Sequence, residues 1–227
     1  MAAKDQGLGP HVGIILAGGG GTRMGVADKA LVKIRGRTML ERVIERLTPQ
    51  VERLVLSANG DPVRFAAFGI PVVPDSTLGL GPLAGLLAGM RWSETNLPEA
   101  RFAASVAADM PFIPLDLVGR LSEGCGRDEN TVALAASSAG THPVCGLWPI
   151  KVADVLERLL KSGENPKVLS FADRFMRLNV PFDDIEPPNG ERVDPFFNVN
   201  TPEDVHRAEE IAAALDGNTA PATAALY

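Results

Sequence analysis

Short apolar runs alternate along the chain with segments in which apolar residues recur at helical spacing. The apolar runs that we expect to form strands are residues 12–16, 30–34, 53–57, 70–73, 102–108, 131–135, 144–148 and 196–199. Such alternation is typical of a mostly parallel sheet flanked by helices. The pattern therefore predicts an α/β, Rossmann-like fold.

Helical periodicity and end signals predict the segments between the strands. We expect helices over residues 38–47, from 82 onward, and over 115–121, 151–161 and 202–215. Thr38 and Glu41 have the spacing of a capping box, and Pro49 ends that helix. Thr201 followed by Pro202 marks the start of the last helix.

The length of 227 residues suits one large domain, and we expect it to span residues 1–215. Residues 216–227 are rich in Ala, Thr and Pro, and we expect a flexible tail there. Hydrophobic residues make up 45% of the chain, which is enough for a packed core.

The net charge of −6 argues against a general nucleic-acid or membrane-surface binder. Basic residues nevertheless gather in one stretch around Asp28, namely Arg23, Lys29, Lys33, Arg35 and Arg37. Such a basic pole suits a small anionic ligand. Ordinary solvated surface charge is the other interpretation, and for the last three residues the two are evenly balanced.

Two cysteines, Cys125 and Cys145, predict neither a disulfide framework nor a zinc site. The first residues lack the apolar core of a signal peptide, and no apolar run approaches the roughly 20 residues that span a bilayer. We expect a cytoplasmic protein without a membrane partner.

A glycine-rich loop follows the first strand directly, with the sequence LAGGGGTRMGVADK over residues 16–29. Glycines let successive backbone N–H groups approach an anion closely. The dinucleotide pattern G-x-G-x-x-G fails, and so does the pattern G-x-x-x-x-G-K, which meets Val26 where lysine is required. The loop is thus of a third kind, with Arg23 and Lys29 as cations, unless it is an ordinary turn.

Asp109 follows the apolar run 102–108. A carboxylate at the carboxyl edge of a parallel sheet lies where α/β proteins bind ligands, and Mg²⁺ is often held by one or two such groups together with substrate phosphates. The sequence therefore predicts an Mg²⁺ ligand at Asp109, with a helix cap or turn residue as the other interpretation.

Two further motifs are candidate binding segments. Asp75 precedes the glycines of segment 79–85, which would allow close packing against a base or ribose, or would simply form a tight loop. Alternation in the predicted strand 196–199 would place Asn198 and Asn200 on one face. His142 is expected to be structural, because no Ser/His/Asp or Cys/His arrangement has a coherent case.

Together these motifs resemble the molybdenum cofactor guanylyltransferase family, the MobA-like nucleotidyltransferases, over about residues 12–210. The family pattern LAGGxxxRMGxxDK is matched without a gap by residues 16–29. The later family blocks are matched by PDSTLGLGPLAGL, AADMPF, HPVCGLWP and FFNVNTPED. The resemblance implies a nucleotidyltransferase fold, with a nucleotide-binding N-terminal part and an acceptor-binding C-terminal part.

The resemblance also implies a role for each matched residue. Nucleotide-binding residues would be Leu16, Ala17, Gly18, Gly19, Lys29, Asn59, Asp75 and Asp109. Catalytic residues would be Arg23, Lys29 and Asp109, with Mg²⁺ on Asp109, and acceptor-binding residues would be Asn198 and Asn200. One departure stands out, because Asn59 is followed by Gly60 and Asp61 and not by a basic residue.

The activity implied is transfer of GMP from GTP to the terminal phosphate of molybdenum-molybdopterin, with release of pyrophosphate. GTP and molybdopterin would be the small-molecule substrates, and transient contact with other cofactor-biosynthesis proteins is expected from the family alone. A cytidylyltransferase or sugar-phosphate nucleotidylyltransferase of the same fold is the alternative, and a degenerate nucleotide-binding module is the non-enzymatic one.

Overall fold

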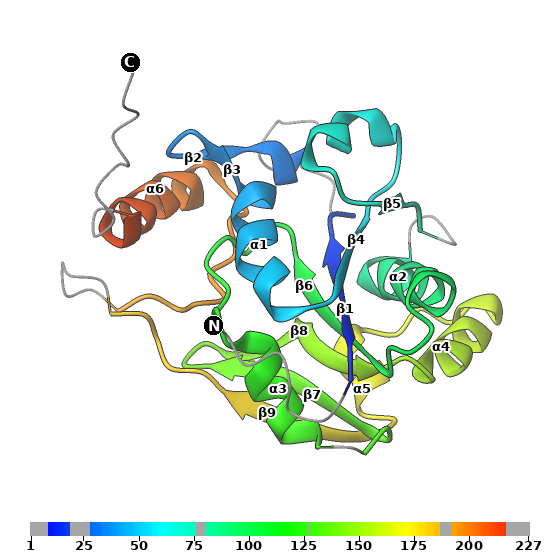
Figure 1. Ribbon diagram of the computed structural model, residues 1–227. Coiled ribbons are helices and arrows are strands. Elements are labelled where there is room, and N and C mark those ends of the chain that lie inside the picture. Colours follow the sequence, from blue (N-terminus) through cyan, green and yellow to red (C-terminus); the bar gives the residue numbers. More distant parts are fainter. Residues whose placement is uncertain (1–8, 19–27, 76–79, 127, 187–191, 217–227) are drawn as a thin grey trace.

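The computed structural model describes residues 9–18, 28–75, 80–126, 128–186 and 192–216. Its centre is a seven-stranded sheet with the order β5-β4-β1-β6-β8-β7-β9 (Figure 1). The strands are β1 His11–Leu16, β4 Arg53–Ser57, β5 Val72–Val73, β6 Phe102–Ala107, β7 Thr131–Ser137, β8 Gly140–Pro149 and β9 Met176–Pro181. Among these strands β8 is the one that runs against its neighbours, so the predicted mostly parallel α/β sheet is confirmed.

The central strand β1 is buried on both faces. It pairs in parallel with β4 on one side and with β6 on the other. Ile14 and Ile15 are both fully buried, but they belong to two different core clusters because consecutive side chains of a strand point to opposite faces. The continuous apolar run of this strand is what a parallel sheet covered on both sides requires.

Helices cover the two faces of the sheet. They are α1 Met39–Leu47, α2 Pro82–Asn96, α3 Leu117–Cys125, α4 Val152–Lys161, α5 Val168–Ala172 and α6 Pro202–Asp216. Helices α1 and α3 contribute to the core on one face, and α2, α4 and α5 contribute to the core on the other (Figure 1). A third, smaller core joins α6 to the hairpin formed by β2 Lys33–Ile34 and β3 Arg37–Thr38.

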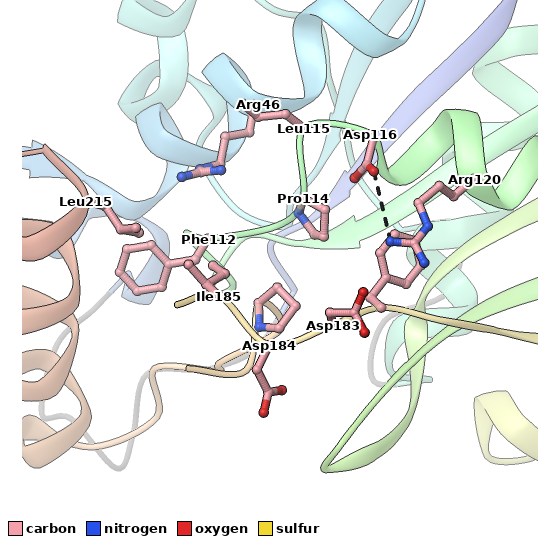
Figure 2. A pocket seen from close by; sticks show the side chains of 12 residues that line it. Arg46, Phe112, Pro114, Leu115, Asp116, Arg120, Asp183, Asp184, Ile185 and Leu215 are labelled. Carbon is pink, nitrogen blue, oxygen red and sulfur yellow. Dashed lines mark ion pairs between the residues drawn. The ribbon is translucent and has the colours of Figure 1, made fainter. Parts of the chain in front are cut away.

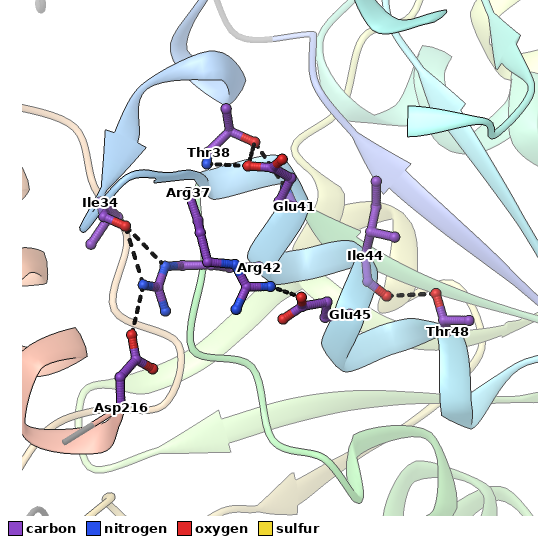
Figure 3. Close-up of polar contacts among 9 residues, drawn as sticks. All are labelled: Ile34, Arg37, Thr38, Glu41, Arg42, Ile44, Glu45, Thr48 and Asp216. Atoms are coloured by element: carbon purple, nitrogen blue, oxygen red, sulfur yellow. Dashed lines mark hydrogen bonds and ion pairs between the residues drawn. The ribbon is translucent and has the colours of Figure 1, made fainter. Parts of the chain in front are cut away.

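The predicted capping box of α1 is confirmed. The Thr38 side chain accepts a hydrogen bond from the Glu41 backbone at 3.1 Å, and the Thr38 backbone donates to the Glu41 carboxylate at 2.5 Å (Figure 3). One turn later, the buried Arg42 donates to the Ile34 carbonyl at 3.1 Å and to Asp216 at 2.9 Å. This guanidinium therefore fastens the end of α6 to the N-terminal half, and Asp216 belongs to the helix and not to the tail.

Several predicted elements differ from those observed. The segment 30–34 is a 3-10 turn, Lys29–Leu31, followed by the two-residue strand β2, which pairs with β3 outside the main sheet. The segment 196–199 is no strand, because the backbone of Phe197 turns back onto Asp194 and that of Val199 bonds to Asp109. Helix α5, strand β9 and the 3-10 helix Pro62–Phe68 were not predicted.

Candidate active site

The carboxyl ends of three neighbouring parallel strands meet at one edge of the sheet. The Ala17 backbone N–H donates to the Ser57 carbonyl at 2.9 Å, and the Ala108 N–H donates to the Leu16 carbonyl at 2.9 Å. Leu16, Ala17 and Gly18 thus lie between the segments that follow β4 and β6. Gly19 and Arg23, which belong to the same motif, fall outside the described residues.

One end of the site is built around the ammonium group of Lys29. Its Nζ lies 2.5 Å from Asp109 Oδ2 and 2.5 Å from Asn200 Oδ1. The Lys29 side chain is only 12% exposed and that of Asp109 is 22% exposed, so the ion pair is largely shielded from water. The fold thereby joins candidates that are 80 and 171 residues apart in the sequence.

Two buried side-chain oxygens of the predicted site residues have no hydrogen-bond partner among the described residues. They are Asp109 Oδ1 and Asn198 Oδ1. Buried acceptors are almost always satisfied in folded proteins, so each of these oxygens has room for a cation or a donor. Both are oxygen ligands of the type that Mg²⁺ prefers. The residues present therefore fit the predicted metal at Asp109.

The ligand set at this end is sparse. Within the described parts of the chain, no group of three or more His, Cys, Asp or Glu side chains is arranged to hold a metal ion. Mg²⁺ is typically bound through one or two carboxylates together with phosphates and water, whereas a dedicated protein cage is unusual for it.

The other end of the site is a polar cluster of Ser57, Asn59 and Asp75. Asn59 Nδ2 donates to Asp75 Oδ2 at 2.8 Å, and the Asp75 backbone donates to Asn59 Oδ1 at 3.0 Å. The Ser57 hydroxyl donates to Asp75 Oδ1 at 2.8 Å. A Cβ on Gly18 would lie 3.7 Å from Asp75 Oδ2, so this cluster adjoins the glycine-rich loop.

Ser57 was not among the residues predicted from the sequence. The signal that could have found it is a hydroxyl at the end of the apolar run 54–56. In the structure the Ser57 residue is only 1% exposed. Gly85 of α2 allows the helix to pack closely against this cluster. A Cβ on Gly85 would stand 2.6 Å from Ser57 Oγ and 3.2 Å from Asp75 Oδ1. Within the predicted segment 79–85, Gly85 therefore supports the site through close packing, whereas a Cβ on Gly81 would meet no atom within 4 Å, and residue 79 lies outside the described residues.

Ser137, His142 and Asp194 form a hydrogen-bonded cluster that is not a hydrolytic triad. The Ser137 hydroxyl donates to Asp194 at 2.9 Å, and His142 Nε2 lies 2.7 Å from the same hydroxyl and 3.6 Å from Asp194. A triad requires the carboxylate on the opposite ring nitrogen from the serine. His142 also lies against Phe196, with ring centroids 4.5 Å apart, so it anchors the loop that leads to Asn198.

The basic hairpin β2–β3 has a surface arrangement. Arg37 pairs with Glu45 of α1, Lys33 is exposed, and the Arg35 backbone N–H donates to Glu209 of α6. These contacts favour ordinary surface charge for the hairpin over a role in ligand binding.

A separate hollow of about 360 Å³ lies beside α1, α6 and the segment after β9 (Figure 2). Phe112, Ile185 and Leu215 line its apolar part, and Arg46 and Arg120 contribute charge. Lys29, Asp109 and Asn200 are not among its lining residues. This hollow is therefore distinct from the site at the strand ends.

Residues 13–175 match the family model of the MobA-like NTP transferase domain. The molybdenum cofactor guanylyltransferase of Bradyrhizobium sp. (strain ORS 278) is 50% identical over 205 residues, which cover 90% of this chain and 94% of the relative. That of Rhodopseudomonas palustris (strain BisB5) is 47% identical over 200 residues, covering 88% and 92%.

Solved structures agree in fold. Molybdopterin-guanine dinucleotide biosynthesis protein A from Archaeoglobus fulgidus has a TM-score of 0.67 at 23% identity, covering 89% of this chain and 98% of that one. A CMP-2-keto-3-deoxy-manno-octonic acid synthetase in complex with CTP has a TM-score of 0.69 at 16% identity, covering 90% and 99%. A guanine dinucleotide biosynthesis protein and a synthetase in complex with CTP both share this fold. The fold alone therefore does not determine which nucleotide base is bound.

Proposed function

The chain belongs to the MobA-like NTP transferase family, and from this membership and the geometry of the site we propose that it is a molybdenum cofactor guanylyltransferase. It transfers GMP from GTP to the terminal phosphate of molybdenum-molybdopterin and releases pyrophosphate. The observation that carries the proposal is the convergence of Lys29, Asp109 and Asn200 at the strand ends, where the glycine-rich loop begins and ends.

The reaction is an in-line attack of the acceptor phosphate on the α-phosphorus of GTP. A phosphate monoester has a second pKa of about 6, so it is largely dianionic at neutral pH and needs no general base. This agrees with a site in which His142 contacts Ser137 and Asp194 in a structural cluster. The remaining difficulty is the meeting of two polyanions, which positioning and electrostatic stabilisation must overcome.

Lys29 supplies a fixed positive charge from a largely buried position. A cation that is already oriented stabilises developing charge without reorganising, and its effect is larger where water is excluded. Arg23, on the glycine-rich loop, is the second cation in this proposal. Asp109 would hold Mg²⁺, which when bound neutralises charge on the phosphates.

The cluster of Asn59 and Asp75 is proposed to hold the guanosine part of GTP. Guanine carries an N–H and an adjacent amino group on one edge, and a carboxylate can accept hydrogen bonds from both. Backbone groups of Leu16, Ala17, Gly18 and Gly19 would complete the nucleotide site. The alternatives that use CTP or a sugar phosphate would employ the same phosphate-binding residues.

Asn198 and Asn200 are proposed to bind the acceptor. Asn200 contacts Lys29, and the Val199 backbone N–H donates to the Asp109 carbonyl at 3.0 Å, so their loop borders the phosphate end. The described helices include none with the length and apolar character of a membrane span. We place the activity in the cytoplasm, with small-molecule substrates and transient contact with neighbouring enzymes of cofactor synthesis.

Turnover and nucleotide titration test the proposal. We expect Asp109→Ala and Lys29→Ala each to lower turnover by about a hundredfold or more, the scale of a lost electrostatic stabiliser. Lys33→Ala, an exposed lysine on β2, is the matched control and should keep its rate. Calorimetry with GTP, CTP, ATP and UTP in Mg²⁺ should show selective GTP binding. Near-wild-type rates in folded Asp109→Ala would contradict the mechanism, and selective CTP binding would favour the cytidylyl alternative.

A further inference from the structure

Arg64 lies in the 3-10 helix Pro62–Phe68, outside every motif of the sequence analysis, yet it contacts two of them. Its Nε donates to Asp28 Oδ2 in a close ion pair. Its Nη2 donates to the Asn59 carbonyl at 2.5 Å, and its Nη1 donates to the Asp61 carbonyl at 2.5 Å. One guanidinium group therefore connects the side chain of Asp28 with the backbone carbonyls of Asn59 and Asp61.

The partners of Arg64 lead directly to the two ends of the site. Asp28 immediately precedes Lys29, the cation at the phosphate end. Its carboxylate does not cap the 3-10 turn Lys29–Leu31, and it is directed to Arg64 instead. Asn59 binds Asp75 through its side chain and Arg64 through its carbonyl. The chain of contacts thus runs from the nucleoside end to the phosphate end.

The local backbone is shaped to receive the guanidinium group. Gly60 has φ +85°, a left-handed conformation that favours glycine, and a Cβ there would stand 3.2 Å from Arg64 Nη1. The Asp61 side chain accepts from the Val63 N–H at 2.9 Å and starts the 3-10 helix that carries Arg64. The guanidinium carbon also lies 4.4 Å from the centroid of the buried Phe65 ring.

We infer that Arg64 is a positioning residue, which fixes the nucleoside-binding Asn59 relative to Lys29 and so sets the spacing between the two ends of the nucleotide site. The inference rests on the proposed function. A guanidinium suits this task because its planar fork bonds in several fixed directions, whereas an ammonium is a single point charge. Its charge is paired with Asp28, which is 15% exposed, so it is not a free phosphate ligand in this arrangement.

The position of Arg64 predicts a particular kinetic pattern. Among its described contacts, Arg64 touches neither Asp109 nor Asn200. The contacts of Lys29 with those two residues do not involve Arg64. Arg64→Ala should therefore raise KM for GTP about tenfold and change kcat by less than about threefold, the scale expected for one or two charge-assisted hydrogen bonds. A loss of folded protein alone would lower kcat and leave KM unchanged.

Binding of guanosine and GTP to the full chain in Mg²⁺ separates positioning from direct phosphate contact. We expect Arg64→Ala to weaken both ligands, because Asn59 is displaced in either case. Arg64→Lys should stay within about threefold of Arg64→Ala, since charge without the fork does not hold the three partners. Asp28→Asn should weaken GTP but not guanosine, and the double variant should be no worse than Arg64→Ala. Arg101→Ala, on a surface ion pair with Glu129, is the control.

Each contrary result has a defined meaning. Weakened GTP with unchanged guanosine in Arg64→Ala would overturn positioning in favour of a phosphate contact. Wild-type affinity in Arg64→Lys would show that charge suffices and would overturn it as well. Equal binding by wild type and Arg64→Ala would overturn this inference alone, whereas absence of guanosine and GTP binding in the wild-type protein would overturn the proposed function with it.

Discussion

Gly85 faces Ser57 and Asp75 from helix α2, and replacing it with alanine should perturb the proposed nucleoside end of the site without altering a polar group. A Cβ at this position would stand 2.6 Å from Ser57 Oγ, 3.0 Å from Leu16 Cδ2 and 3.2 Å from Asp75 Oδ1. The serine would have to move by roughly 0.8 Å to reach an ordinary contact of 3.4 Å. Because Ser57 bonds to Asp75 at 2.8 Å, that movement displaces the carboxylate too.

Two magnitudes follow for Gly85→Ala. Overpacking costs about 1–3 kcal/mol, and alanine returns about 1 kcal/mol of helix propensity, so the free energy of unfolding should fall by up to about 2 kcal/mol. If Asp75 binds the base as proposed, its displacement should lose a charge-assisted hydrogen bond worth about 1.5–3 kcal/mol. At about 1.4 kcal/mol per tenfold, the Kd for GTP should rise about 10- to 150-fold.

Gly89→Ala is the matched control, since Gly89 lies one turn further along the same helix. A Cβ on Gly89 would meet three carbons of Ile14 at 2.7 Å. Ile14 belongs to the hydrophobic core and not to the candidate site. Urea denaturation should show comparable destabilisation in both variants, while calorimetry at a temperature where both are folded should show weakened GTP binding in Gly85→Ala alone. Equal GTP affinity in the two variants would refute the assignment of Asp75 to the nucleoside.

Three further predictions concern the rest of the molecule. Arg42→Met should lower the free energy of unfolding in urea by about 1–3 kcal/mol, because it removes the buried donor to the Ile34 carbonyl and one partner of Asp216, and it should leave GTP affinity unchanged because these contacts lie outside the site. Unchanged stability would contradict this prediction. Burial lowers the pKa of His11 below its ordinary 6.5, so the unfolded chain binds more protons below that pH and stability present above pH 6.5 is lost on acidification. His11→Phe should shrink this loss in urea titrations at about pH 7 and pH 5.5, and an equal loss in both proteins would exclude His11 as its source. Burial raises the pKa of Cys125 to about 11 and that of Cys145 to about 12, so neither should react with iodoacetamide at about pH 8 until the protein is unfolded, and rapid labelling of the native protein would show that the thiols are accessible.

The sheet was largely predictable because its signals are local. Strand β1, helix α1 with its capping box, and the order of strands and helices all follow from periodicity and end signals within a few residues. The two wrong or missing strand predictions depend on contacts between distant segments. Strand β9 alternates apolar and polar residues, but it is an edge strand whose Met176 and Leu178 stay exposed, and its pairing with β7 joins distant segments. The segment 196–199 was predicted as a strand, but its backbone bonds to Asp109 and Asp194 and not to a sheet.

The sequence by itself determined which chemistry the chain can carry: the glycine-rich loop, the lysine that ends it, and carboxylates that follow apolar strands. Its motifs placed the chain in its family. Tertiary structure alone decided which of these groups meet, because the contacts of Lys29 with Asp109 and Asn200 close loops of 80 and 171 residues. It also revealed Ser57 and Arg64, whose positions depend on the packing of α2 and on the turn at Gly60. Local propensity carries no information about such distant contacts, since they are stabilised only after the sheet has brought the strand ends together.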